Sequence, residues 1–108
     1  MQHRDLEEKR WAAMPLVEQM ANIGSEVIRF MKWKGKNNHE YAHLALLRAL
    51  ELFDLTLTAK TVSSELREVA RARELWLDYS MGDNQYRQTA SQWEKYFTAF
   101  AYAARQLR

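Results

Sequence analysis

The feature of this sequence that most constrains its fold is the recurrence of apolar residues every three or four positions along four segments. That spacing gathers apolar side chains on one face of an α-helix. The segments run over residues 15–33, over residues 39–57, from residues 61–64 to Gly82, and from Ser91 to the C-terminus. Three glycines and one proline leave few turns for an all-β fold. The sequence therefore predicts an all-α fold.

The order of these segments predicts the architecture of the chain. Four helices with short connections favour an up-and-down four-helix bundle over residues 15–108. Residues 1–14 are predicted to be an N-terminal extension, in which residues 6–14 could form a short extra helix carrying Trp11. No internal repeat and no linker interrupts the chain, so one bundle domain is expected.

The apolar stripes predict which residues face the core. Gly24 lies on the first stripe, so we expect another helix to approach it closely. The predicted inner residues are Leu16, Met20, Ile23, Val27, Phe30, Ala42, Ala45, Leu46, Ala49, Leu52, Phe53, Leu66, Val69, Ala72, Trp76, Tyr79, Trp93, Phe97, Phe100, Ala104 and Leu107.

Capping residues predict where the helices begin and end. Asn38 is expected to cap the second helix, and one of the three hydroxyls in residues 61–64 is expected to cap the third. Ser91 and Glu94 have the spacing of a capping box, in which each side chain bonds the backbone amide of the other residue. Gly82 is expected to end the third helix.

Composition excludes several classes of function. The chain has no cysteine, which excludes disulfides, thiolate metal sites and cysteine nucleophiles. No apolar run approaches the roughly 18 residues that span a bilayer, and the first ten residues are too polar for a signal peptide. We therefore expect a cytoplasmic protein without a membrane partner. The net charge of +2 is too small to require a nucleic-acid partner, and no cofactor is predicted.

Two histidines form the sharpest chemical motif of the sequence. His39-Glu40-Tyr41-Ala42-His43 fits the pattern H-E-x-x-H, in which two histidines one turn apart hold zinc and the glutamate is a general base. A zinc hydrolase is therefore one alternative. The motif begins at the start of a helix, beside a polar turn and without a marked third ligand. The favoured interpretation is two surface histidines that bind no metal.

A basic cluster is the second candidate site. Its members are Arg29, Lys32, Trp33, Lys34 and Lys36, and no acidic residue lies between residues 26 and 40. Cations beside an exposed aromatic ring can hold phosphate and stack a base, which would suit nucleic acid or an acidic partner. Cations also stabilise a helix C-terminus, and that simpler interpretation is favoured.

The polar loop after Gly82 is the third candidate. Asp83, Asn84 and Tyr86 place an aromatic ring beside tight-turn residues, an arrangement that could contact a ligand or a partner. The alternative is that Tyr86 folds back and covers the end of the bundle. The sequence does not separate these two possibilities.

Three resemblances accompany these motifs. Residues 73–79 resemble the HEPN ribonuclease motif of an arginine followed by histidine, but Asp78 stands in place of the histidine, so RNA cleavage is not expected. Arg73 is then expected to pair with a carboxylate of its own helix. Residues 22–27, 49–56 and 82–86 (NIGSEV, ALELFDLT and GDNQY) look like a group of short prokaryotic all-helical proteins, which implies no particular activity. In size, charge and helix count the chain is similar to the S23-type four-helix proteins, some of which form rings and bind nucleic acid with a reverse transcriptase.

No catalytic constellation in the sequence is complete. Four tryptophans and five tyrosines are a heavy aromatic load for 108 residues, so some rings are expected to be partly exposed or buried in an interface. The leading hypothesis is therefore a non-catalytic interaction protein that self-associates into a homo-oligomer or contacts another protein. Nucleic-acid binding through the basic cluster is the main alternative.

Overall fold

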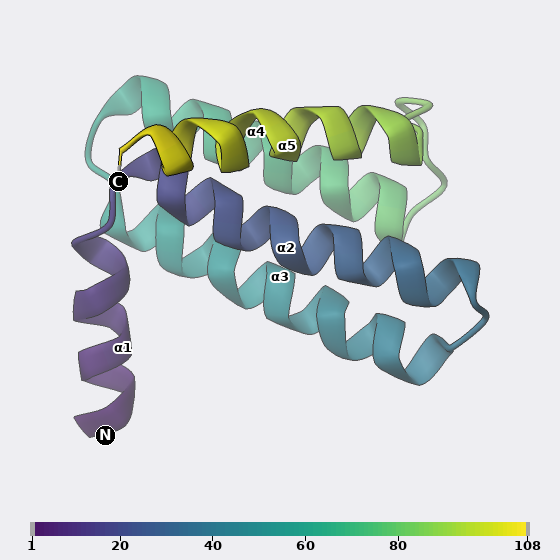
Figure 1. The fold of residues 1–108 in the computed structure, drawn as a ribbon, viewed down its shortest axis with the longest axis horizontal. Coiled ribbons are helices and arrows are strands. Elements are labelled where there is room, and N and C mark those ends of the chain that lie inside the picture. Colours follow the sequence, from purple (N-terminus) through teal and green to yellow (C-terminus); the bar gives the residue numbers. More distant parts are fainter. Residues whose placement is uncertain (1, 108) are drawn as a thin grey trace.

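The chain folds into α-helices throughout the part that the computed structural model describes, which is residues 2–107 of the backbone and the side chains from Leu6 to Leu107 (Figure 1). Within this range five helices and no strand are found. The helices are α1 (Gln2–Ala12), α2 (Leu16–Gly35), α3 (His39–Ala59), α4 (Ser63–Ser80) and α5 (Ala90–Gln106). The predicted all-α fold is confirmed. The predicted extra N-terminal helix is also present, although it begins at Gln2 rather than at residue 6.

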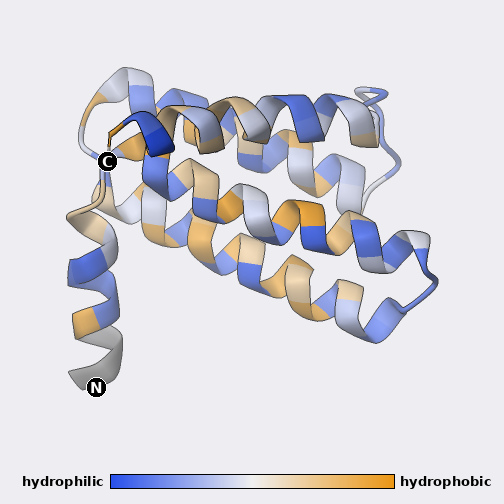
Figure 2. Cartoon of the chain, in the orientation of Figure 1, coloured by the Kyte–Doolittle hydropathy of each residue, from blue (hydrophilic) through white to orange (hydrophobic). Residues whose placement is uncertain are grey.

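The four longer helices lie together and α1 projects from them (Figure 1). Helices α2 and α3 run side by side in opposite directions, joined by the turn at residues 36–38. Helix α2 packs against both α3 and α5, while α4 packs against α3. Helix α1 contacts α3 and points away from the other helices, so it forms an arm. Figure 2 shows residues 6–12 of this arm as mostly hydrophilic.

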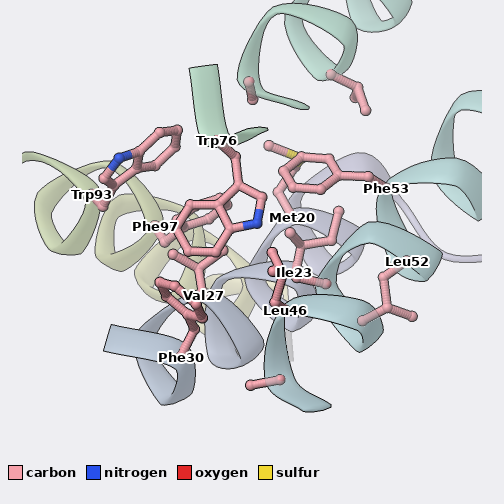
Figure 3. Packing of buried hydrophobic residues seen from close by; sticks show 14 of the residues in the cluster. Met20, Ile23, Val27, Phe30, Leu46, Leu52, Phe53, Trp76, Trp93 and Phe97 are labelled. Carbon is pink, nitrogen blue, oxygen red and sulfur yellow. The ribbon is translucent and has the colours of Figure 1, made fainter. Parts of the chain in front are cut away.

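The core is built from the predicted stripes, with Trp76 near its centre (Figure 3). Trp76 has no exposed surface, and its ring meets Phe30 edge-on at 5.1 Å and Trp93 edge-on at 5.6 Å between centroids. Edge-to-face pairs of this kind add to the free energy of burial. Most predicted inner residues are buried or pack against the buried cluster. Leu107 is an error of the prediction, because it lies just beyond the last turn of α5 and is 59% exposed.

Gly24 allows α2 and α5 to pack closely. A Cβ atom at Gly24 would lie 2.6 Å from the Cβ of Phe97, closer than carbon atoms pack. Gly24 itself is buried on the inner face of α2. The predicted close approach of another helix at this glycine is confirmed, and that helix is α5.

The helix caps are partly as predicted. Asn38 caps α3, because its side-chain oxygen accepts a hydrogen bond from the Tyr41 N–H. The predicted hydroxyl cap of α4 is wrong. The N-cap of α4 is Val62, which offers no side-chain acceptor, and the three hydroxyls of residues 61–64 lie on either side of it.

The capping box of α5 is displaced by two residues from its predicted position. Thr89 is the N-cap and accepts from the Gln92 N–H, while the Gln92 side chain accepts from the Thr89 N–H. The sequence fits this pattern twice, as Thr89-x-x-Gln92 and as Ser91-x-x-Glu94. Extended backbone angles at Thr89 place the start of α5 at Ala90, so Ser91 is already helical and the predicted box is wrong.

Candidate functional site

The basic cluster lies at the C-terminal end of α2 and in the turn that follows. Arg29 is an ion-pair member rather than a free cation, because its guanidinium lies 3.2 Å from the Glu26 carboxylate one turn earlier. Lys32, Lys34 and Lys36 are exposed, and none of them pairs with a carboxylate among the residues described. The positive charge of this cluster that no carboxylate neutralises therefore comes from its three lysines.

The ring of Trp33 contacts two of these lysines. The ammonium groups of Lys32 and Lys36 each lie 5.5 Å from the Trp33 ring centroid, within the range of a cation–π contact. The same ring meets Tyr41 of α3 edge-on at 4.9 Å. Trp33 is half-buried as a result, so it presents part of a ring to solvent, and less than the sequence suggested.

The histidine pair lies at the start of α3. His39 is the first residue of the helix, His43 follows one turn later, and both side chains are exposed. Among the residues whose side chains are described, no group of three histidine, aspartate or glutamate side chains comes together in a way that could hold a metal ion. The arrangement is that of two surface histidines in a first turn.

The loop between α4 and α5 is held by hydrogen bonds of its own residues. The Asp78 carboxylate accepts from the backbone amides of Gln85 at 2.9 Å and Tyr86 at 3.1 Å. The Asn84 side chain donates to the Gln88 carbonyl and accepts from the Gln88 N–H, both at 2.9 Å. Asn84 also has a φ of 53°, which asparagine tolerates well. Its amide therefore shapes the loop.

Two loop residues remain open to solvent. Asp83 is exposed, and Tyr86 is 53% exposed instead of packing over the end of the helices. Of the three residues predicted as a loop contact, these two have exposed side chains.

The residues that resemble the HEPN motif have structural partners. Arg73 of α4 donates to Asp54 of α3 at 2.9 Å, so the expectation that it pairs within its own helix is wrong. Asp78 is occupied by the loop amides. Arg73 thus links α4 to α3, and Asp78 links α4 to the loop of residues 82–88.

The outer face of α3 is a candidate surface that the sequence predictions missed. Leu44 and Leu47 are 58% and 50% exposed, and Tyr41 beside them is 48% exposed. The opposite face of the same helix is fully used in the core. On a helical wheel, Leu44 and Leu47 lie on the side opposite the inner stripe that contains Ala42 and Leu46. Their positions in the sequence therefore could have predicted an exposed apolar face.

Comparison with known proteins assigns no role to these surfaces. No protein-family model matches the chain, and neither a curated protein nor a solved structure gives a significant match. Within the described residues, no helix is both long enough and apolar enough to cross a membrane.

Proposed function

We propose that this protein is a non-catalytic, self-associating helical module, with α2–α5 as an up-and-down bundle and the outer face of α3 as the contact between copies. The observation that carries this proposal is the exposure of Leu44 and Leu47 on successive turns of a helix whose other face is buried. Leucines at helical spacing on an open face are the usual basis of helix–helix contacts.

The outer face of α3 is complementary to itself. Two copies of α3, placed antiparallel about a two-fold axis at Leu47, bring Leu47 against Leu47 and the exposed Leu44 towards Leu50 of the other copy, which is half-buried against its own core. The same symmetry sets His43 of each copy opposite Glu51 of the other, where Glu51 is already paired with Arg48 of its own copy. An isologous contact needs this self-complementary pattern, because each residue pair occurs twice.

The α1 arm extends the same surface. Glu7 of α1 lies 3.2 Å from Arg48 of α3, and Leu6 beside it is 61% exposed. Stable interfaces bury roughly 1,200–2,000 Å² in total. The arm supplies additional apolar and polar area next to the leucines of α3.

Analytical ultracentrifugation of the full chain tests this proposal. We expect a dimer in the micromolar range and a monomer for Leu47→Glu, with unchanged helical circular dichroism. Met81→Ser is the matched control, because Met81 is 63% exposed at the end of α4 and away from α3. A wild-type chain that remains monomeric at high micromolar concentration would rule out self-association, and a monomeric Met81→Ser chain would move the contact elsewhere.

A second candidate function, nucleic-acid binding, rests on the three lysines of the basic cluster. Lys32, Lys34 and Lys36 fall within five residues, are exposed, and have no carboxylate partner among the residues described. Three phosphate contacts would make duplex binding weaken roughly forty-fold between about 50 and about 200 mM salt.

Fluorescence anisotropy with labelled duplex DNA and single-stranded RNA separates this function from self-association. Binding should be lost in Lys32→Glu/Lys36→Glu and retained in Lys95→Glu, which changes an exposed lysine of α5. Equal binding by the double variant and the wild type would exclude the cluster as the contact.

A further inference from the structure

A cleft of about 490 Å³ lies between α4 and α5. Its volume falls within the range of small-molecule sites, which are mostly apolar and carry a few polar groups. The walls come from both helices and from the end of the preceding loop. They are formed by Arg67, Glu68, Arg71, Ala72, Leu75, Gln88, Gln92, Trp93 and Tyr96.

Large aromatic rings keep α4 and α5 apart and so create this cleft. Trp93 of α5 meets Trp76 of α4 at 5.6 Å and Tyr79 of α4 at 6.2 Å between ring centroids. The Tyr96 hydroxyl donates to the Glu68 carboxylate at 2.8 Å, which ties the two helices together. Helices α4 and α5 are thus joined by aromatic side chains and one hydrogen bond, and their backbones stay apart.

Two arginines give the cleft its charge. Arg67 and Arg71 lie one turn apart on α4, so their side chains share one face of the helix. Both are exposed, and neither forms an ion pair with a carboxylate of the described residues. The carboxylate of Glu68, which lies between them in sequence, accepts from Tyr96. Two neighbouring guanidinium groups are therefore available to one anion.

An unpartnered indole marks the apolar wall. Trp93 is only 3% exposed, and its Nε1–H is buried without a hydrogen-bond partner among the described residues. Buried indole N–H groups usually have an acceptor, because leaving one unpaired costs free energy. Trp76 also has an unpartnered N–H, but Trp76 does not line the cleft. The nitrogen itself is covered, so Trp93 contributes its ring, and not its N–H, to the wall of the cleft.

We propose that the α4–α5 cleft binds a small organic anion with a flat apolar body, of the class of aromatic carboxylates, sulfonates and phosphates. The anionic group lies between Arg67 and Arg71, and the apolar body lies against Leu75 and Trp93. This proposal is independent of self-association, because it uses neither α1 nor the outer face of α3.

The larger groove between α1 and α3 is a weaker candidate. Its volume is about 620 Å³, but two of its three acidic residues, Glu51 and Asp54, are paired with Arg48 and Arg73. Charges that are already paired offer a ligand little additional attraction. The α4–α5 cleft has two unpaired arginines and an apolar wall together.

Fluorescence titration with 1-anilinonaphthalene-8-sulfonate tests this site, and neutral N-phenyl-1-naphthylamine is the matched probe without the anion. The wild-type chain should bind the sulfonate about tenfold more tightly than the neutral probe, a ratio typical of charged hydrogen bonds. Arg67→Gln/Arg71→Gln should abolish this preference. Arg105→Gln, which changes an exposed arginine outside the cleft, should keep it.

The indole N–H resonances locate the bound probe by NMR. The sulfonate should shift the resonance of Trp93 and leave that of Trp11 unchanged, since Trp11 donates to Thr56 outside the cleft. Unchanged preference in the arginine double variant would overturn the proposal. So would a shift confined to other tryptophans, or loss of binding on substitution of Leu44 and Leu47 by serine.

Discussion

The indole N–H of Trp11 donates a hydrogen bond of 2.8 Å to the hydroxyl of Thr56, which lies 45 residues later in the chain. The Thr56 hydroxyl in turn donates to the Leu52 carbonyl at 2.8 Å. The Gln19 side chain donates to the Trp11 carbonyl at 2.8 Å, so the end of α1 is bound from two helices. Trp11 is therefore the anchor of the N-terminal arm, although residues 6–10 of α1 are all exposed.

Removing this anchor should destabilise the whole chain. Trp11→Ala deletes a ring that is 7% exposed, and large-to-small changes of this kind cost roughly 3–5 kcal/mol of unfolding free energy. Thr56→Val keeps the shape but leaves the indole N–H unpaired, at a cost of about 1–3 kcal/mol. Urea unfolding followed by circular dichroism measures both.

Leu6→Ala is the control for the anchor, because Leu6 lies on the same helix and is 61% exposed. We expect a change within about 0.5 kcal/mol, as is usual at exposed positions. If Trp11→Ala were no more harmful than Leu6→Ala, α1 would not be anchored through its tryptophan.

The close contact between α2 and α5 predicts a second pair of variants. Gly24→Ala places a Cβ 2.6 Å from the Cβ of Phe97, so the two helices must separate, with a loss of about 1–3 kcal/mol. Gly35→Ala adds the same atom at the end of α2, where nothing lies within 4 Å, and should stabilise by up to about 1 kcal/mol. Thermal unfolding of both variants tests this difference in sign.

Most of the core could be predicted because helical periodicity is a local property of the sequence. Ala42, Leu46, Ala49 and Phe53 follow the 3.6-residue repeat and are all buried. The bond from Trp11 to a hydroxyl on α3 could not be predicted, because it depends on where α1 crosses that helix. Tertiary contacts of this kind have no signature in local spacing.

The candidate sites also combine features that the local sequence predicts with features that depend on the tertiary structure. The lysines of the basic cluster were visible as a run of charge, and the pairing of Arg29 with Glu26 could have been expected from their spacing of three. The cleft beside Arg67 and Arg71 could not, because it exists only through the separation of α4 and α5 by aromatic rings. Its single sequence signal is two arginines one turn apart.

The half-buried Tyr96 of α5 predicts a loss of stability at high pH. Burial, together with the hydrogen bond to Glu68 and its charge, raises the pKa of Tyr96 well above its usual value near 10. The unfolded chain therefore releases this proton at a lower pH than the folded chain does. The free energy of unfolding should fall as pH rises above about 10, by up to about 1.4 kcal/mol per pH unit from this group.

Urea unfolding at a series of pH values between neutrality and about 11 measures this slope. Tyr96→Phe removes the group, so its stability should fall less steeply than that of the wild type over the alkaline part of the series. The burial of Tyr79 raises the pKa of that hydroxyl as well, and its contribution stays in both proteins. Parallel curves for the two proteins would contradict the assignment to Tyr96.

The two overlapping capping patterns at the start of α5 predict opposite results for two hydroxyl residues. Thr89→Ala removes the acceptor for the Gln92 N–H, which lies 3.2 Å from the Thr89 hydroxyl, and should cost about 1 kcal/mol. Ser91→Ala changes a residue that is already helical and exposed, so it should be neutral or slightly stabilising, because alanine has the higher helix propensity. Chemical denaturation of the two single variants decides which hydroxyl caps the helix. A larger loss for Ser91→Ala would mean that α5 begins two residues later in solution, with Ser91 and Glu94 as its capping box.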